Sequence, residues 1–257
     1  MVTALLLALL TFAPLAPDTA VDGTGWLAKS QAHLYVWPSP GVRVSFQVRT
    51  NMLEPAIAAL EKDPAVAADP DKSRWVDALR HIEIKCTMDT GTGVVQTDVD
   101  LSYEPSDPRG KAASDKMKAG IATLISHAFQ GLPLHDASLL HKGGTVVGAE
   151  ERGDSVIVTV TGKDEKDKSS IHLNKRTELP DSIDGADLAY RMKYVEVVPG
   201  KFALSRLDTR TPAGKESHAE YTYQKAGSLS FPSTIRVSEG PQVATFSFVS
   251  LKVEAGR

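Results

Sequence analysis

The chain has 257 residues, of which 42% are apolar and 24% are charged, and its formal net charge is -3. This length can bury one large core or two modest ones, and this composition excludes an intrinsically disordered chain. Lys and Arg are interspersed with Asp and Glu and form no basic stripe, which excludes nucleic acid as an expected partner.

Residues 1–20 have the pattern of a secretory signal. An apolar run from Ala4 to Leu10 is followed by two prolines and then by small residues, which is the order of an apolar core and a cleavage site. The run is too short to span a bilayer. No Lys or Arg precedes it and no clean Ala-x-Ala site follows it, so an uncleaved N-terminal anchor is the alternative. We expect export to the periplasm or cell envelope, cleavage after Ala20, and a single domain over residues 21–257.

Alternation of apolar and polar residues predicts the first three strands. From Val42 to Arg49 every second residue is apolar, which predicts a strand with one dry face and one wet face. The pattern returns over residues 82–89 and 95–104. Between these two strands the glycines of Asp89-Thr90-Gly91-Thr92-Gly93 permit a tight hairpin turn.

The single cysteine of the chain, Cys86, lies in the apolar register of the second strand. One cysteine excludes an intrachain disulfide, and its distance from the signal excludes a lipoprotein cleavage site. A buried, inert thiol is therefore expected in place of a nucleophile.

Two helical inserts interrupt the strands, at residues 51–81 and 111–130. In the first, two amphipathic stretches flank a Pro- and Ala-rich loop or hinge at residues 63–70, and Asn51 to Glu54 approximate a capping box. The second insert is one long helix that ends at Gly131 and Pro133. Its apolar side chains at three- and four-residue steps include Met117, Ile121, Leu124 and Ile125.

After Gly143 the chain reads as a series of short strands separated by turn residues. Together with the first three they make about eleven strands. Because the linkers are short, we expect an antiparallel meander with one dry face. The eight ranges are 145–150, 155–161, 170–174, 192–198, 202–209, 218–224, 231–238 and 243–253.

A sheet of this size cannot stay flat, because its twist makes it curl. The predicted fold class is therefore α+β, mainly β, with a curved antiparallel sheet that forms a half-open barrel and helices that cover its concave face. Burial of Met117, Ile121, Leu124 and Ile125 would hold the long helix in place by roughly 6 to 12 kcal/mol, while each buried ligand methylene returns about 0.8 kcal/mol. An acyl chain could thus displace this helix as a lid, whereas a small polar metabolite could not.

The C-terminal sequence HAEYTYQKAGSLSFPSTIRVSEGPQVATFSFVSLKVE resembles the end of bacterial outer-membrane lipoprotein carriers of the LolA/LolB-like superfamily. An aromatic strand, a Phe-Pro-Ser-x-Ile segment and a last strand that ends in an aliphatic-Lys-Val pattern follow one another. The resemblance implies an exported half-open barrel that carries lipid or a lipoprotein acyl chain on its concave face. The two helical inserts depart from the superfamily pattern. The matching residues are Tyr221, Tyr223, Phe231, Pro232, Ser233, Ile235, Phe246, Phe248, Leu251 and Val253.

We therefore predict a monomeric carrier or sensor, without enzymatic activity, that binds an apolar ligand and meets a protein partner of the cell envelope. The ligand-binding residues expected on the concave face are Val44, Phe46, Ile84, Met88, Val99, Leu101, Tyr221, Tyr223, Phe246 and Phe248.

Two other functions stay open. The aromatic residues can instead form a filled core, which would make the chain a protein-interaction module of the envelope. The tripeptide Asp89-Thr90-Gly91 also matches aspartic proteases, which need two carboxylates that share a proton. No second copy occurs in the sequence, so this enzyme would require a homodimer.

No cofactor or metal is expected. The histidines show neither the HExxH pattern nor a Cys/His ligand spacing, and the glycines show no P-loop or dinucleotide-binding pattern. His135, Asp136 and His141 come closest to a cluster, for which a solvated loop is the preferred interpretation.

Overall fold

The structure is a computed structural model that describes residues 21–38, 41–130, 132, 144–162 and 168–254. The predicted signal at residues 1–20 and the residues His135, Asp136 and His141 lie outside these ranges. Among the helices that the structure describes, none combines the length and apolar character needed to cross a membrane.

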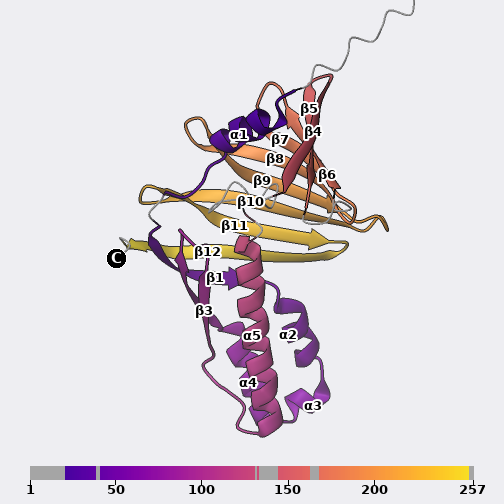
Figure 1. The fold of residues 1–257 in the computed structure, drawn as a ribbon. Helices are drawn as coiled ribbons and strands as arrows, with labels where there is room; N and C mark the ends of the chain where they lie inside the picture. Colours follow the sequence, from indigo (N-terminus) through magenta and orange to yellow (C-terminus); the bar gives the residue numbers. More distant parts are fainter. Residues whose placement is uncertain (1–20, 39–40, 131, 133–143, 163–167, 255–257) are drawn as a thin grey trace, which may run out of the picture.

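Twelve antiparallel strands form one curved, open sheet. Their order is β3-β2-β1-β12-β11-β10-β9-β8-β7-β6-β5-β4, so the first strand pairs with the last, and β3 and β4 form the two edges of the sheet (Figure 1). The fold-class prediction is confirmed. The strands are β1 (Arg43–Thr50), β2 (Glu83–Asp89), β3 (Val95–Asp100), β4 (Thr145–Arg152), β5 (Ser155–Thr161), β6 (Lys168–Asn174), β7 (Pro180–Asp184), β8 (Ala189–Val198), β9 (Lys201–Arg210), β10 (Glu216–Ala226), β11 (Leu229–Glu239) and β12 (Gln242–Glu254).

The sheet has one more strand than the sequence pattern predicts. The additional strand is β7, which is five residues long and begins with a proline. Proline cannot donate to a strand ladder and is found at the first residue of a strand. So short an element, opened by a turn-forming residue, gives too little alternation to be recognised.

Five helices accompany the sheet: α1 (Gly23–His33), α2 (Glu54–Glu61), α3 (Pro64–Ala67), α4 (Pro70–Arg80) and α5 (Pro108–Gln130). The long helix is as predicted but begins earlier, where the Asp107 carboxylate accepts hydrogen bonds from the amides of Arg109 and Gly110 at 3.0 and 2.9 Å. The segment 63–70, predicted as a loop or hinge, contains α3.

The capping-box prediction at Asn51 is wrong, because this side chain reaches the sheet. The N-cap residue of α2 is Leu53, without a side-chain cap. Asn51 instead accepts a hydrogen bond from the amide of Thr245 at 2.8 Å. It thereby ties the start of the first insert to β12.

The dry face of the sheet is covered in three places. At one end Leu27 of α1 packs on the valines of β5 and on Ile171 and Leu173 of β6. In the middle, residues 34–37, here called the strap, bring Tyr35 and Trp37 onto β11. Ile121, Ile125 and Phe129 of α5 complete the main core.

A separate cluster holds the helical lobe, which comprises α2, α3, α4 and the N-terminal half of α5. Ile57, Val66, Val76 and Leu79 form its centre. The lobe projects from the β1 end of the sheet (Figure 1).

A bulge in β12 carries backbone strain. Gln47 pairs with Val249 and Ser45 with Lys252, which leaves one extra residue on β12. Ser250 lies there with φ at +57°. The left-handed conformation costs a residue with a Cβ atom about 1 to 2 kcal/mol relative to glycine.

We expect Ser250→Gly to raise the free energy of unfolding by about 0.5 to 1 kcal/mol, because glycine adopts this conformation without the steric cost. Urea denaturation measures the change. The control is Ser247→Gly, on a regular part of the same strand, which should lower stability by about 0.5 to 1 kcal/mol. Equal effects at both positions would contradict the strain at Ser250.

The end of α5 offers a second stability test. Phe129 is 3% exposed, whereas Leu124 is 43% exposed. Phe129→Ala should cost about 3 to 5 kcal/mol because it opens a cavity in the core. Leu124→Ala should change stability by no more than about 0.5 kcal/mol. Thermal and urea denaturation of the two variants check this contrast, and a mild effect of Phe129→Ala would show that α5 does not close the core.

Candidate functional site

Most of the predicted ligand-binding residues lie in the filled centre of the concave face. Their side chains are buried between the sheet, the strap and α5, and they belong to one continuous apolar cluster. The members of this group are Val44, Phe46, Ile84, Met88, Val99, Phe246 and Phe248.

Four phenylalanine rings fill this centre. The ring of Phe129 from α5 lies 5.6 Å from Phe46, 5.6 Å from Phe231 and 5.1 Å from Phe248, measured between centroids. Such tilted and edge-on contacts at 4.5–7 Å stabilise aromatic clusters. Neither Phe129 nor the strap was among the predicted site residues, although the spacing of Phe129 from Ile125 could have indicated it.

The strap is fixed by hydrogen bonds to β11. The Trp37 indole donates to the carbonyl oxygen of Ser230 at 3.1 Å, and the Tyr35 hydroxyl accepts from the amide of the same residue at 2.8 Å. Trp37 also stacks on Phe231 with 5.9 Å between ring centroids. These bonds make the strap part of the core.

In the part of the chain that the structure describes, side chains on the concave face between α1 and α5 are less completely buried than those at its centre. Strands β7 to β10 present a group of apolar and aromatic side chains there, here called the tyrosine stretch. Its members point to the same face because they alternate with polar residues and lie opposite one another in register. They are Ile183, Tyr190, Met192, Tyr194, Leu207, Ala219, Tyr221 and Tyr223, of which only Met192 and Tyr221 are fully buried.

Two of the four hydroxyls in the tyrosine stretch are bonded within the protein. Tyr223 donates to the carbonyl oxygen of Leu204 at 2.7 Å, and Tyr194 lies 3.4 Å from the sulfur of Met192. The hydroxyls of Tyr190 and Tyr221 have no hydrogen-bond partner within the described part of the chain. Their hydroxyls are therefore available to polar atoms of a ligand.

All four phenols of the stretch are neutral at physiological pH. Burial raises the pKa of Tyr221 to about 12 and also raises the pKa of Tyr190. Burial raises the pKa of Tyr194 and Tyr223 further, with smaller contributions from the charge of Asp181 and from Tyr221 respectively. The stretch thus combines an apolar surface with uncharged hydrogen-bond donors.

The predicted lid residues on α5 divide between two environments. Ile121 and Ile125 are buried against the sheet, and Met117 contacts both the main core and the core of the helical lobe. Leu124 points away from the sheet and is exposed. It cannot contribute to a lid in this position.

Leu101 is not on the sheet. It follows the last residue of β3 and packs into the core of the helical lobe. The extended apolar pattern over residues 95–104 did not show that the strand ends at Asp100. The ligand-binding prediction for Leu101 therefore falls on a residue outside the concave face.

A pocket of about 710 Å³ lies in the helical lobe. It opens between α3, α4 and the start of α5, and its walls include apolar side chains while its rim includes four aspartates. No sequence pattern predicts this pocket, because its residues are distributed over four helices and the segments between them.

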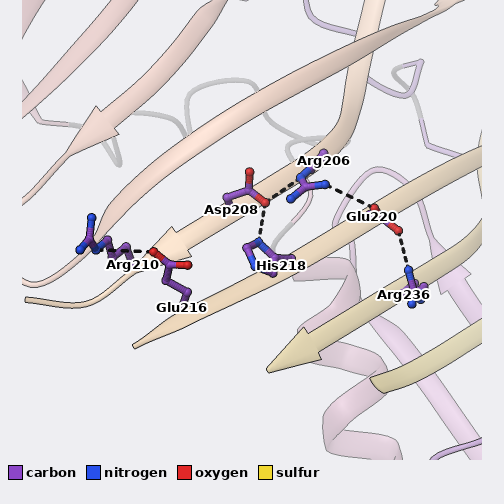
Figure 2. A network of polar contacts seen from close by, with 7 residues as sticks. All are labelled: Arg206, Asp208, Arg210, Glu216, His218, Glu220 and Arg236. Atoms are coloured by element: carbon purple, nitrogen blue, oxygen red, sulfur yellow. Dashed lines mark hydrogen bonds and ion pairs between the residues drawn. The ribbon is translucent and has the colours of Figure 1, made fainter. Parts of the chain in front are cut away.

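The convex face of the sheet carries an ion-pair network across β9, β10 and β11 (Figure 2). Asp208 accepts from Arg206 and from His218, both at 2.7 Å, and Glu220 pairs with Arg206 at 3.6 Å and with Arg236 at 3.1 Å. Burial raises the pKa of Asp208, but the bonds from His218 and Arg206 outweigh it and hold this pKa below its usual value. Such partly exposed pairs keep the outer face polar and contribute little each to stability.

Asp89 has a structural role in a hairpin turn. Its exposed carboxylate accepts hydrogen bonds from the amides of Gly91 and Thr92 at 2.8 and 3.0 Å. The Thr90 hydroxyl accepts from the amide of Val42 at 2.9 Å. These bonds confirm the turn predicted from the glycines, and they favour it over the protease interpretation.

Cys86 is buried on β2, as predicted. Burial raises its thiol pKa to about 11, and its sulfur lies 3.5 Å from the hydroxyl of Thr97. A thiol with this pKa is almost entirely protonated at neutral pH and is a poor nucleophile. Within the described ranges no three His, Cys, Asp or Glu side chains form a group that could hold a metal ion.

The geometry defines a class: an open, curved antiparallel sheet whose concave face is covered by helices and retains a half-buried aromatic stretch. No protein family matches the sequence, and no curated protein matches it. Among solved structures, the chain is similar to the LolA superfamily protein NE2245 from Nitrosomonas europaea at 11% identity, over 93% of this chain and 96% of that chain, with a TM-score of 0.29. A TM-score this low supports no conclusion about fold or function. The fold of this chain is defined by the pairing of its own twelve strands.

The raised tyrosine pKa values give a testable pH dependence. All six tyrosines of the chain have a raised pKa. In the unfolded chain they ionise near pH 10, so the folded state holds more protons above that pH. The stability that this provides is complete below about pH 10 and is lost as pH rises toward the folded pKa; for Tyr221 it amounts to about 2 to 3 kcal/mol.

Near pH 10, ultraviolet titration should show the tyrosines about half ionised in urea and less ionised in the native protein. Urea denaturation between about pH 9 and pH 11 should show falling stability, and Tyr221→Phe should reduce the slope. Native tyrosines that ionise near pH 10 would contradict the burial of the stretch.

Proposed function

We propose that this protein is an exported, monomeric carrier or sensor that binds a lipid, a lipoprotein acyl chain or another apolar ligand on the concave face of its sheet. The tyrosine stretch is the binding surface. The observation that carries this proposal is that, within the described part of the chain, most of these side chains are only partly buried, whereas the rest of the concave face is packed by α1, the strap and α5.

The chemistry of the stretch favours an apolar ligand with a few uncharged acceptors. Aromatic and aliphatic side chains gain about 25 cal/mol for each Å² of apolar surface removed from water. The free hydroxyls of Tyr190 and Tyr221 suit an ester, amide or carboxyl oxygen, because neutral phenols donate a hydrogen bond without requiring an opposite charge. An ester-linked or amide-linked acyl chain has both features.

Energetics favour binding beside α5 over its displacement. Removing Ile121, Ile125 and Phe129 from the core would cost roughly 5 to 9 kcal/mol. At about 0.8 kcal/mol each, six to eleven ligand methylenes would be needed merely to offset that cost. A ligand that enters the tyrosine stretch meets no such cost. In this proposal Met117, Ile121 and Ile125, which the sequence predicts as a movable lid, form a fixed wall of the site.

The proposal is tested by native mass spectrometry of protein purified from its own envelope, followed by organic extraction and titration with a fluorescent fatty acid. An apolar molecule should accompany the protein, and the fatty acid should bind. Ala219→Trp, on the concave face between Leu207 and Val237, should weaken binding at least about tenfold because the larger side chain fills the site.

The matched control is Thr222→Trp, which adds the same side chain to the same strand at an exposed position. It should leave binding unchanged. The proposal is wrong if no apolar molecule is extracted and the fatty acid does not bind, or if both tryptophan variants weaken binding equally.

The filled centre of the concave face favours a second candidate function, a non-enzymatic interaction module of the envelope. The four packed rings of Phe46, Phe129, Phe231 and Phe248 are what a purely structural core requires. The same titration separates the two functions, because a module of this kind binds no fatty acid in either the parent protein or Thr222→Trp.

A further inference from the structure

The pocket in the helical lobe is not used by the function proposed above. Its apolar wall includes Leu60, Val66, Trp75 and Val76. Its volume of about 710 Å³ lies within the range of roughly 300 to 1,000 Å³ that is usual for small-molecule sites. The pocket belongs to a different core cluster from the tyrosine stretch, so occupation of one does not require the other.

Trp75 distinguishes this pocket from an ordinary surface hollow. Its ring lines the pocket, and its indole nitrogen is enclosed without a hydrogen-bond acceptor within the described part of the chain. Native proteins rarely leave a buried donor unpaired. A ligand oxygen that reaches this wall through a small movement of the ring would provide the acceptor, and an indole ring also attracts cations to its face.

The rim of the pocket has an excess of negative charge. It carries Asp63, Asp69, Asp71 and Asp107 against Lys72 and Arg109. Asp69 is already paired with Lys72 at 3.4 Å, and Asp71 lies 3.9 Å from Arg74.

Two aspartates of the rim keep a carboxylate oxygen free. Asp63 and Asp107 each use one oxygen to accept from backbone amides at the start of a helix. Their second oxygens have no partner among the residues that the structure describes. Both aspartates line the same pocket, so a cation there can pair with either free oxygen without disturbing the cap.

We propose that this pocket is a second binding site, for a small organic cation in which an ammonium group is joined to an apolar or aromatic body that bears a hydrogen-bond acceptor. The body lies against Val66, Trp75 and Val76, and the ammonium group lies between Asp63 and Asp107. The site is independent of the ligand on the concave face.

The probe is 3-phenoxypropylamine, which has an aromatic ring, an ether oxygen and a primary ammonium. The comparison compounds are 3-phenoxypropanol and 3-phenoxypropionate, which keep the ring and ether but are neutral or negative. The full chain is labelled with 5-fluorotryptophan, and its three tryptophans give separate fluorine NMR resonances. Trp75→Phe identifies the resonance of Trp75.

The amine should shift the Trp75 resonance and leave Trp37, beside the concave face, unchanged. The alcohol should bind at least about fivefold more weakly and the carboxylate should produce no shift, because only the amine gains from the rim charge. The fatty acid titration tests the concave face and the amine titration tests the lobe pocket. Either proposal can therefore fail while the other holds. Equal binding of amine and carboxylate, or no shift at Trp75, would overturn the proposal.

The double variant Asp63→Asn, Asp107→Asn removes both charges and keeps both helix caps, because asparagine caps helices as well as aspartate does. It should weaken amine binding at least about fivefold with little change in melting temperature. Asp77→Asn, on α4 outside the pocket, removes one exposed charge and should leave binding unchanged.

If the double variant does not fold, Ala65→Trp provides the test, since it fills the pocket from an exposed position and should abolish the Trp75 shift. Unaltered amine binding in the folded double variant, or in Ala65→Trp where the double variant does not fold, would overturn the proposal.

Discussion

The structure depends on one constraint: an open sheet of twelve strands has a single dry face that must be removed from water. Strands about 4.8 Å apart make this face far wider than one helix, whose diameter with side chains is about 10 Å. The chain meets the requirement with three separate covers, namely α1, the strap and the end of α5. Within the described residues, these covers bury the tyrosine stretch less completely than the rest of the face, and most of its side chains stay partly buried.

The strand order explains why α5 lies where it does. β3 and β4 follow one another along the chain but occupy opposite edges of the sheet. α5 belongs to their connection. Its N-terminal half lies in the helical lobe, and its C-terminal half packs on the apolar face of the sheet and covers it there. Phe129 marks the point where α5 meets β1, β11 and β12.

Local alternation was sufficient to predict the sheet, and long-range pairing was not. Residues 42–49 and 82–89 show period-two patterns that any strand with one dry face must have. The pairing of β1 with β12 joins residues some 200 positions apart, and no local pattern encodes it. α1 was missed because its sequence contains two glycines and few large apolar residues. Of the tyrosine stretch, the sequence pattern predicts Tyr221 and Tyr223 as ligand-binding residues. It does not predict Tyr190, because the expected strand begins only at Met192, and it offers no candidate residue on that strand, which leaves out Tyr194.

The two proposed sites differ in chemistry because the two cores differ in construction. The concave face is built from alternating strands, so most side chains that point inward are apolar or neutral phenols, whereas the convex face carries the ion-pair network of Figure 2. The helical lobe is built from short helices, whose exposed amides need caps, and aspartates supply them. Each cap brings a negative charge to the mouth of the lobe pocket. α5 joins the two cores through Met117 at one point and Phe129 at the other. A helix fixed at both points keeps the concave wall and the lobe pocket in place together, so each ligand meets a surface already formed.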